Sequence, residues 1–246
     1  MNNTIQIIPL TKLALSFLPV LVVIVILYKW RMEYRNALYA ISRMLVQLLL
    51  IGYFLAYLFR SESWLLISLV LAVMLIASSL IALRTAGKKQ NRLFTQALIS
   101  IALGGGLTLI LVTQGVLELS PWYYPRFMIP LAGMIFANAL NSISLAVERL
   151  ESELDRGIAF LEARKIAFRA SLIPITNSLF AVGLVSLPGM MTGQILSGVS
   201  PLIAVRYQIM VMTMVFGAAG ISAAVFLILA KNKITIHHIP STPEKW

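Results

Sequence analysis

The hydrophobic positions of this chain gather into long uninterrupted stretches, and short polar segments separate them. Seven stretches are each long enough to cross about 30 Å of hydrocarbon as a helix. They cover Ile7–Tyr28, Leu38–Leu58, Trp64–Leu83, Gln96–Leu117, Phe127–Val147, Leu172–Val199 and Tyr207–Ala230. The sequence lacks the short alternating segments that are typical of a membrane β-barrel. The pattern therefore predicts an all-α polytopic membrane protein with about seven spans, forming one transmembrane domain over residues 1–246.

The overall composition supports this prediction. Hydrophobic residues make up 59% of the 246 positions and charged residues only 12%, whereas soluble domains are about 45–50% apolar and about 25% charged. This excludes an ordinary soluble enzyme and a disordered chain. The chain has no cysteine, which excludes disulfides, zinc–thiolate sites, iron–sulfur clusters and thiol catalysis. No basic segment precedes the first stretch, so we expect no cleaved signal peptide.

The basic residues are distributed unevenly between the two sides of the predicted spans. The polar segments after the first, third, fifth and seventh stretches, with Arg43 just inside the second, hold sixteen of the 20 Lys and Arg residues. The opposite side holds Lys12, Arg60, Arg126 and Arg206. The positive-inside rule places the richer side in the cytoplasm, so we expect the N-terminus outside and the C-terminus inside. Topology thus accounts for the net charge of +11, and no nucleic-acid partner is needed to explain it.

The largest hydrophilic segment, residues 148–170, lies on the predicted cytoplasmic side. Its acids recur at helical spacing, and its apolar residues (Leu150, Leu154, Ile158 and Leu161) form a separate stripe, which indicates an amphipathic helix. Gly157 is expected to divide it into an extension of the fifth span and a short second helix. Because its charges are mixed, the segment does not resemble a membrane-surface anchor. It is either a docking element for a soluble partner or a solvated connection between two spans.

The sixth stretch contains a sequence that should interrupt a helix at membrane depth. Pro188 removes a backbone hydrogen bond and Gly189 adds freedom, so the helix should kink or break there. Breaks of this kind often mark transport sites. With nearby small, amide and methionine side chains on the fifth and sixth stretches, the break defines a candidate substrate pathway: Asn138, Asn141, Asn177, Pro188, Gly189, Met190, Met191, Gly193 and Gln194. The alternative for each residue is ordinary helix–helix packing.

Several kinds of chemistry have no basis in the sequence. No acid lies securely within a predicted span, and His237 and His238 lie in the C-terminal tail. This argues against ion-coupled transport, which usually needs intramembrane ionisable groups, and against intramembrane proteolysis. Gly104–Gly106 is followed by no lysine and forms no phosphate-binding loop. We therefore expect no enzyme and no cofactor bound by this chain, and any energy source must come from another chain.

The residues LVSLPGMMTGQILSG (184–198), followed by Pro201, Ala204 and Arg206–Gln208, closely resemble the signature of the Fet-type iron-export permeases. Further matches are Gln47–Gly52 and Pro130–Met134. That family comprises membrane subunits of bacterial ATP-binding-cassette (ABC) transporters and has plant relatives linked to aluminium tolerance. The resemblance implies about seven spans in the bacterial inner membrane and a separate cytoplasmic ATPase that binds ATP and Mg²⁺. It also implies iron export that protects against oxidative stress.

If the chain is such a permease, we expect two permeases to pair and each to bind an ATPase through the segment 148–170. The candidate coupling residues are Glu148, Glu151, Asp155, Arg156, Glu162 and Arg164. The chain departs from the expected family pattern at Leu161-Glu162-Ala163, where a Leu-Gly-Ala step is expected. The departure leaves the docking geometry open.

The sequence is also compatible with other functions. The chain could be a stand-alone secondary transporter or channel, an ABC permease for a non-metal solute, or a membrane scaffold that senses stress. The metal ligands are unassigned. In the absence of cysteine, any metal carried would be held transiently by oxygen donors and thioethers.

Overall fold

The computed structural model describes residues 8–60, 63–84, 90–231 and 233, which are helical apart from short connections. They form two compact units, Met1–Ser61 and Glu62–Trp246. No strand occurs within the described ranges. The predicted all-α class is confirmed.

The first unit contains a helical hairpin. Helix α1 (Leu10–Leu15) leads into α2 (Leu18–Lys29), and α3 (Tyr34–Leu58) returns alongside it. The rings of Tyr28 and Tyr34 pack edge to face at 5.4 Å across the connection. Pro19 stands in the first turn of α2, where its missing N–H costs no hydrogen bond. The apolar windows of both helices are exposed, as expected of surfaces that face lipid.

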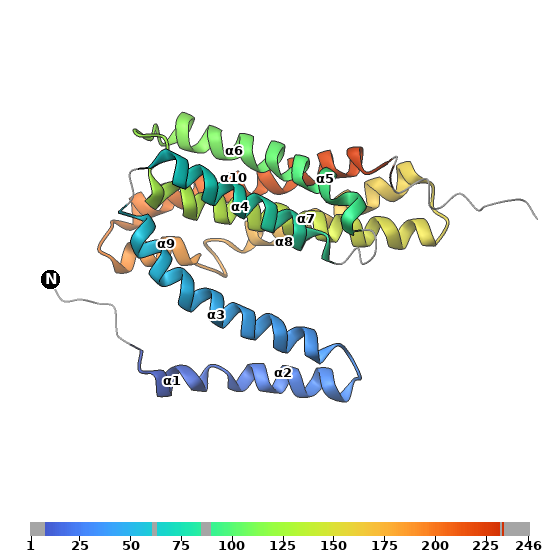
Figure 1. Ribbon diagram of the computed structural model, residues 1–246, viewed down its shortest axis with the longest axis horizontal. Coiled ribbons are helices and arrows are strands. Elements are labelled where there is room, and N and C mark those ends of the chain that lie inside the picture. Colours follow the sequence, from blue (N-terminus) through green and yellow to red (C-terminus); the bar gives the residue numbers. More distant parts are fainter. Residues whose placement is uncertain (1–7, 61–62, 85–89, 232, 234–246) are drawn as a thin grey trace, which may run out of the picture. The chain divides into compact units, whose positions relative to one another are not determined.

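The second unit is a bundle of long helices. Helices α4 (Trp64–Ala82), α7 (Pro125–Asp155) and α10 (Pro201–Leu229) run side by side with a helix that extends from Gln90 to Val116 (Figure 1). The last of these comprises α5 (Gln90–Ile101), α6 (Leu107–Ile110) and two π-helical segments, Ala102–Gly106 and Leu111–Val116. The core forms where α7 packs on α10, and alanines such as Ala139 and Ala218 are fully buried there. Small residues of this kind let membrane helices approach closely.

The first π-helical segment lies against α10 at very short range. A Cβ atom on Gly104 would lie 2.3 Å from Ser222 Oγ and 2.6 Å from its backbone nitrogen. A Cβ on Gly105 would lie 3.1 Å from Ile135 of α7. Gly104 and Gly105 are therefore positions of close helix packing.

Six helices of the described residues are long and apolar enough to cross a membrane. They cover Leu10–Lys29, Tyr34–Leu58, Trp64–Ala82, Gln90–Val116, Pro125–Asp155 and Pro201–Leu229. The remaining predicted span, Leu172–Val199, is not a single helix. It is divided between α8 (Phe160–Ala181) and the short α9 (Gly189–Leu196). The total of seven spans and their orientation stay predictions.

The interruption of the predicted sixth span begins earlier than Pro188. Helix α8 ends at Ala181, and Gly183 takes a left-handed conformation with φ +83°. Its N–H donates to Ser186 O at 3.0 Å, and the N–H of Val185 donates to Ala181 O at 2.8 Å. Pro188 then caps α9, because its extended backbone precedes the first helical residue. The proline thus starts a helix after the break.

The division at Gly157 is confirmed, but the second helix is not short. Helix α7 ends at Asp155, Gly157 has φ +80°, and α8 begins at Phe160. Helix α8 then continues for 22 residues. The apolar sequence after Arg169 joins the polar segment without a helix-breaking residue until Pro174, which α8 accommodates.

Candidate functional site

A cavity of about 350 Å³ lies between the end of α8, α9 and the first half of α10. Its walls come from three elements that the break in the predicted sixth span brings together. The lining residues are Leu179, Val182, Gly183, Met191, Val205, Gln208, Ile209, Met212 and Thr213. We call this space the α8–α10 cavity. Its wall is mostly apolar, with two thioethers and two polar side chains.

The two polar side chains differ in their hydrogen bonding. The Thr213 hydroxyl donates within its own helix, to Ile209 O at 3.0 Å and Met210 O at 2.9 Å. Gln208 is only 5% exposed, and its Oε1 has no hydrogen-bond partner in the described part of the chain. A buried amide oxygen without a donor is costly. Because Oε1 is itself buried, this oxygen presents no surface to the cavity in this conformation.

Of the predicted pathway residues, Met191 lines this cavity. Pro188 caps α9, and Gly189, Met190, Gly193 and Gln194 lie on it, next to the cavity in sequence. The Oε1 of Gln194 is also buried without a partner. Met191 therefore lines the cavity, whereas the other predicted residues of α9 are not part of the lining.

The three predicted asparagines lie apart from the cavity lining. Asn138 on α7 donates from Nδ2 to Met134 O at 2.8 Å, within its own helix. Asn141 on α7 and Asn177 on α8 are exposed. Helical spacing can show which residues share one face of a helix, but it could not show which face of α7 or α8 meets the cavity.

Sequence reasoning did not include Gln208, Met212 and Thr213 among the pathway residues. All three stand on α10. The available signal was an amide four residues before a methionine within an apolar stretch, a spacing that places both on one helix face.

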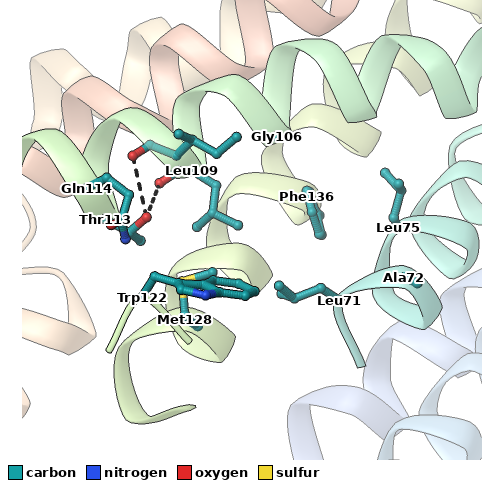
Figure 2. Close-up of a pocket in the computed structure, with 11 residues that line it drawn as sticks. Leu71, Ala72, Leu75, Gly106, Leu109, Thr113, Gln114, Trp122, Met128 and Phe136 are labelled. Atoms are coloured by element: carbon teal, nitrogen blue, oxygen red, sulfur yellow. Dashed lines mark hydrogen bonds between the residues drawn. The ribbon is translucent and has the colours of Figure 1, made fainter. Parts of the chain in front are cut away.

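A second cavity, of about 440 Å³, lies between α4, the Gln90–Val116 helix and α7 (Figure 2). Leu71 and Leu75 of α4 face Gly106 and Leu109 across it, and Trp122 lies along its wall. The buried hydroxyl of Thr113 donates to Leu109 O at 2.8 Å. Unlike Gln208, this buried polar group is already satisfied within its own helix.

The polar segment 148–170 comprises the end of α7, a short connection at residues 156–159 and the first half of α8. We call the connection and the helix ends beside it the α7–α8 turn. Glu153 is 3% exposed, and its Oε1 lies 2.6 Å from Arg149 Nη2 and 3.6 Å from Arg156 Nη1. Glu153 was not among the candidate coupling residues. Its burial and two cationic neighbours indicate that it holds the end of α7 together.

The candidate coupling residues lie around this turn. Glu148, Asp155, Arg156 and Glu162 are exposed, while Glu151 and Arg164 are half-buried. Glu162 stands in the first turn of α8 and pairs with Lys165 at 3.2 Å. An acid in the first turn interacts favourably with the positive end of the helix dipole, which gives a local reason for the departure at Leu161-Glu162-Ala163. Ile158 and Leu161 add exposed apolar surface.

Helix α8 connects this turn with the α8–α10 cavity. At 1.5 Å per residue its 22 residues span about 33 Å, and its first half belongs to the polar segment 148–170. The turn and α9 lie at opposite ends of the bundle (Figure 1). Among the described residues no group of three or more His, Cys, Asp or Glu side chains could hold a metal ion.

A family model described as "Uncharacterised protein family (UPF0014)" matches residues 10–164 and 155–235. The chain belongs to this family. It is 37% identical over 220 residues to the UPF0014 membrane protein slr1647 of Synechocystis, covering 83% of this chain and 80% of that protein. It is 33% identical to the probable iron export permease protein FetB of Escherichia coli, over 90% of both chains.

A plant protein is similar too. The protein ALUMINUM SENSITIVE 3 of Arabidopsis thaliana is 32% identical, over 87% of this chain and 83% of its own length. No solved structure matches. The resemblance noted from the PGMMTGQ segment is thus confirmed, and this UPF0014 chain is a multi-pass membrane protein.

Proposed function

We propose that this chain is the permease subunit of an ABC exporter that moves iron out of the bacterial cytoplasm across the inner membrane. The observation that carries the proposal is the 33% identity to a probable iron export permease over 90% of both chains. In this proposal two permeases pair, and a separate ATPase subunit binds ATP and Mg²⁺. The chain itself hydrolyses nothing.

The α7–α8 turn supports the docking of a soluble ATPase. It presents exposed charges of both signs together with the exposed apolar side chains of Ile158 and Leu161, a combination that suits a protein interface. The ion pairs of Glu153 fix the end of α7. Because α7 and α8 also pack on each other, a force applied at the turn would act on both helices.

The α8–α10 cavity supports a substrate-binding role at the other end of α8. ATP-driven closure of the ATPase pair would tilt α8, and the cavity would change its access as its three walls shift. Because the residues 182–188 are not helical, α9 can move with respect to α8 without bending a continuous helix.

The test of transport is ATP-dependent uptake of labelled iron into inverted vesicles that contain the chain and its ATPase. Accumulation should need both subunits and hydrolysable ATP. Uptake of another solute without iron would contradict the iron assignment. Uptake by this chain alone would identify a stand-alone transporter.

The test of docking is the triple variant Glu151→Gln, Asp155→Asn, Glu162→Gln. We expect the ATPase to be lost from the purified complex, because three negative charges of the segment 148–170 no longer match their partners. A control that neutralises two exposed acids outside the segment (Glu33→Gln and Glu118→Gln) should retain it. Unchanged ATPase recovery with the triple variant would show that the segment does not dock the ATPase.

A further inference from the structure

The mixed charge of the segment 148–170 separates by helix in the structure. Four of its five acids stand on α7, and three of its five bases, Arg164, Lys165 and Arg169, stand on α8. On α8 the one acid, Glu162, pairs with Lys165. Arg169 is exposed and forms no ion pair or hydrogen bond with any described residue. The first half of α8 is therefore a basic surface that includes an unpaired cation.

The contacts of α8 with its neighbours fix the height of this surface in the bundle. The Ser142 hydroxyl on α7 donates to Ser171 O on α8 at 3.2 Å. The two serines lie at nearly equal distances in sequence from Gly157, as expected for an antiparallel pair of helices. A Cβ on Gly220 of α10 would lie 3.8 Å from Leu172 Cδ2. Residues 171–172 of α8 thus lie beside the apolar parts of α7 and α10, both long enough to cross the membrane.

This register places the cations of α8 at the edge of the apolar part of α7. Lys165 lies level with Glu148, the first charged residue after the apolar stretch of α7, and Arg169 lies level with Ser144. Four residues of helix correspond to about 6 Å, so the Arg169 backbone lies that far inside the boundary. Because helical side chains lean toward the N-terminus, the Arg169 guanidinium is directed back toward the boundary, where lipid headgroups lie.

The exposed side of α8 continues from these cations into apolar side chains. Ile173 follows Arg169 by four residues, a spacing that keeps both on one side of a helix, and it is 53% exposed. Phe180, seven residues further on, is 78% exposed. Along this side two cations are thus followed by apolar surface, in the order in which a phospholipid presents its phosphate and its acyl chain.

We propose that Lys165, Arg169 and Ile173, the α8 basic face, bind an anionic phospholipid. The headgroup phosphate contacts the two cations, and an acyl chain lies along Ile173. Arginine binds phosphate by paired hydrogen bonds, and basic residues beside membrane helices attract anionic headgroups. A soluble acidic protein could reach Lys165, but Arg169 and Ile173 lie beside the apolar part of α7, where a charge without a counter-ion is costly. The proposal goes beyond the proposed function and needs neither iron nor an ATPase.

The probes are phosphatidylglycerol and phosphatidylcholine with the same acyl chains. Native mass spectrometry of the purified full chain in mild detergent would follow the titration of each lipid. We expect the first phosphatidylglycerol to bind at least about tenfold more tightly, because the ammonium of phosphatidylcholine offsets its phosphate charge. This preference should fall when ammonium acetate is raised from about 0.1 M to about 1 M, which shortens the screening length.

The double variant Lys165→Gln, Arg169→Gln removes both cations. Each basic residue near a lipid surface contributes about fivefold to the affinity, so phosphatidylglycerol should bind about 25-fold more weakly and phosphatidylcholine as before. Arg169→Lys keeps the charge and should lose less than about fivefold. The matched control is Arg126→Gln, Arg206→Gln, which removes two exposed cations near the starts of α7 and α10 and should bind like the wild type.

Equal affinity of the wild type and the double variant for phosphatidylglycerol, or an equal loss in the control, would overturn the proposal. Both replaced side chains are exposed, so the double variant should unfold at the wild-type temperature in lipid-free detergent. If it does not fold, the wild type decides, because a preference that is insensitive to salt would also overturn the proposal. A double variant that keeps its lipid and loses the ATPase would show that the face binds an acidic protein instead.

Discussion

Single residues fix how closely the helices of the second unit can approach. Gly104 and Gly106 stand two positions apart in the same π-helical segment, yet they meet different surroundings. A Cβ on Gly104 would overlap Ser222, whereas a Cβ on Gly106 would have nothing within 4 Å. Replacing each of these two glycines by alanine therefore separates the effect of contact between helices from the effect of the backbone freedom of glycine.

Gly104→Ala should lower the free energy of unfolding by about 1–3 kcal/mol, the usual cost of inserting a methyl group into a tightly packed interior. Gly106→Ala is the control and should be neutral or slightly stabilising, since alanine favours a helix over glycine. Thermal unfolding in detergent would measure both. Equal effects of the two substitutions would mean that the segment does not pack on α10 as described.

At the scale of elements, the α7–α8 turn depends on one backbone conformation. Gly157 has φ +80°, and a side chain there would meet no atom within 4 Å. The requirement for glycine is therefore conformational, because a left-handed backbone costs other residues roughly 1–2 kcal/mol. The same turn sets the angle between the two helices that carry the proposed docking surface.

Gly157→Val should reduce ATPase recovery and lower the free energy of unfolding by roughly 1–2 kcal/mol, because a β-branched residue is strained at this φ. Gly157→Asn should behave nearly like the wild type, since asparagine tolerates the left-handed region. Co-purification and thermal unfolding would be measured on the same samples. If valine and asparagine act alike, the conformation of residue 157 does not set the turn.

The end of a helix could be predicted from the sequence wherever an apolar stretch is followed by charged residues. The end of α7 at Asp155 and the division at Gly157 follow from local sequence alone. The end of α8 could not be predicted in this way, because Leu179–Val185 is as apolar as the helix before it. A break was predicted at Pro188–Gly189, but its start after Ala181 is visible only when Gly183 and the backbone hydrogen bonds of residues 183–186 are seen in three dimensions.

The site was predicted less completely than the fold. Met191 was found because it follows a proline–glycine pair, a strong local signal. Gln208 follows Arg206 and Tyr207 at the start of an apolar stretch, and its burial and the absence of a donor for Oε1 distinguish it. Neither property can be derived from one-dimensional spacing.

At the scale of the whole molecule, the orientation in the membrane rests on the uneven distribution of basic residues. The absence of cysteine makes it directly measurable, because each introduced cysteine would be the only thiol in the chain. Ser120, between the Gln90–Val116 helix and α7, and Ser152, near the end of α7, are both exposed. They lie at opposite ends of α7.

Ser120→Cys should react with a membrane-impermeant maleimide added to intact cells, because the positive-inside rule places that connection outside. Ser152→Cys should react only after the membrane is opened. The unmodified chain is the control for background labelling. The reverse pattern would invert the assigned orientation and place the α7–α8 turn on the wrong side for an intracellular ATPase.

Helix α8 also has a mechanical consequence. A rod about 33 Å long that pivots by about 10° at one end displaces its other end by about 6 Å, more than one helical turn of rise. Such a lever turns a small rotation at the polar end of α8 into a larger displacement at Ala181, where the helix ends. Because equilibrium coupling is reciprocal, a molecule that props the far end open should in turn change how tightly the ATPase holds the near end.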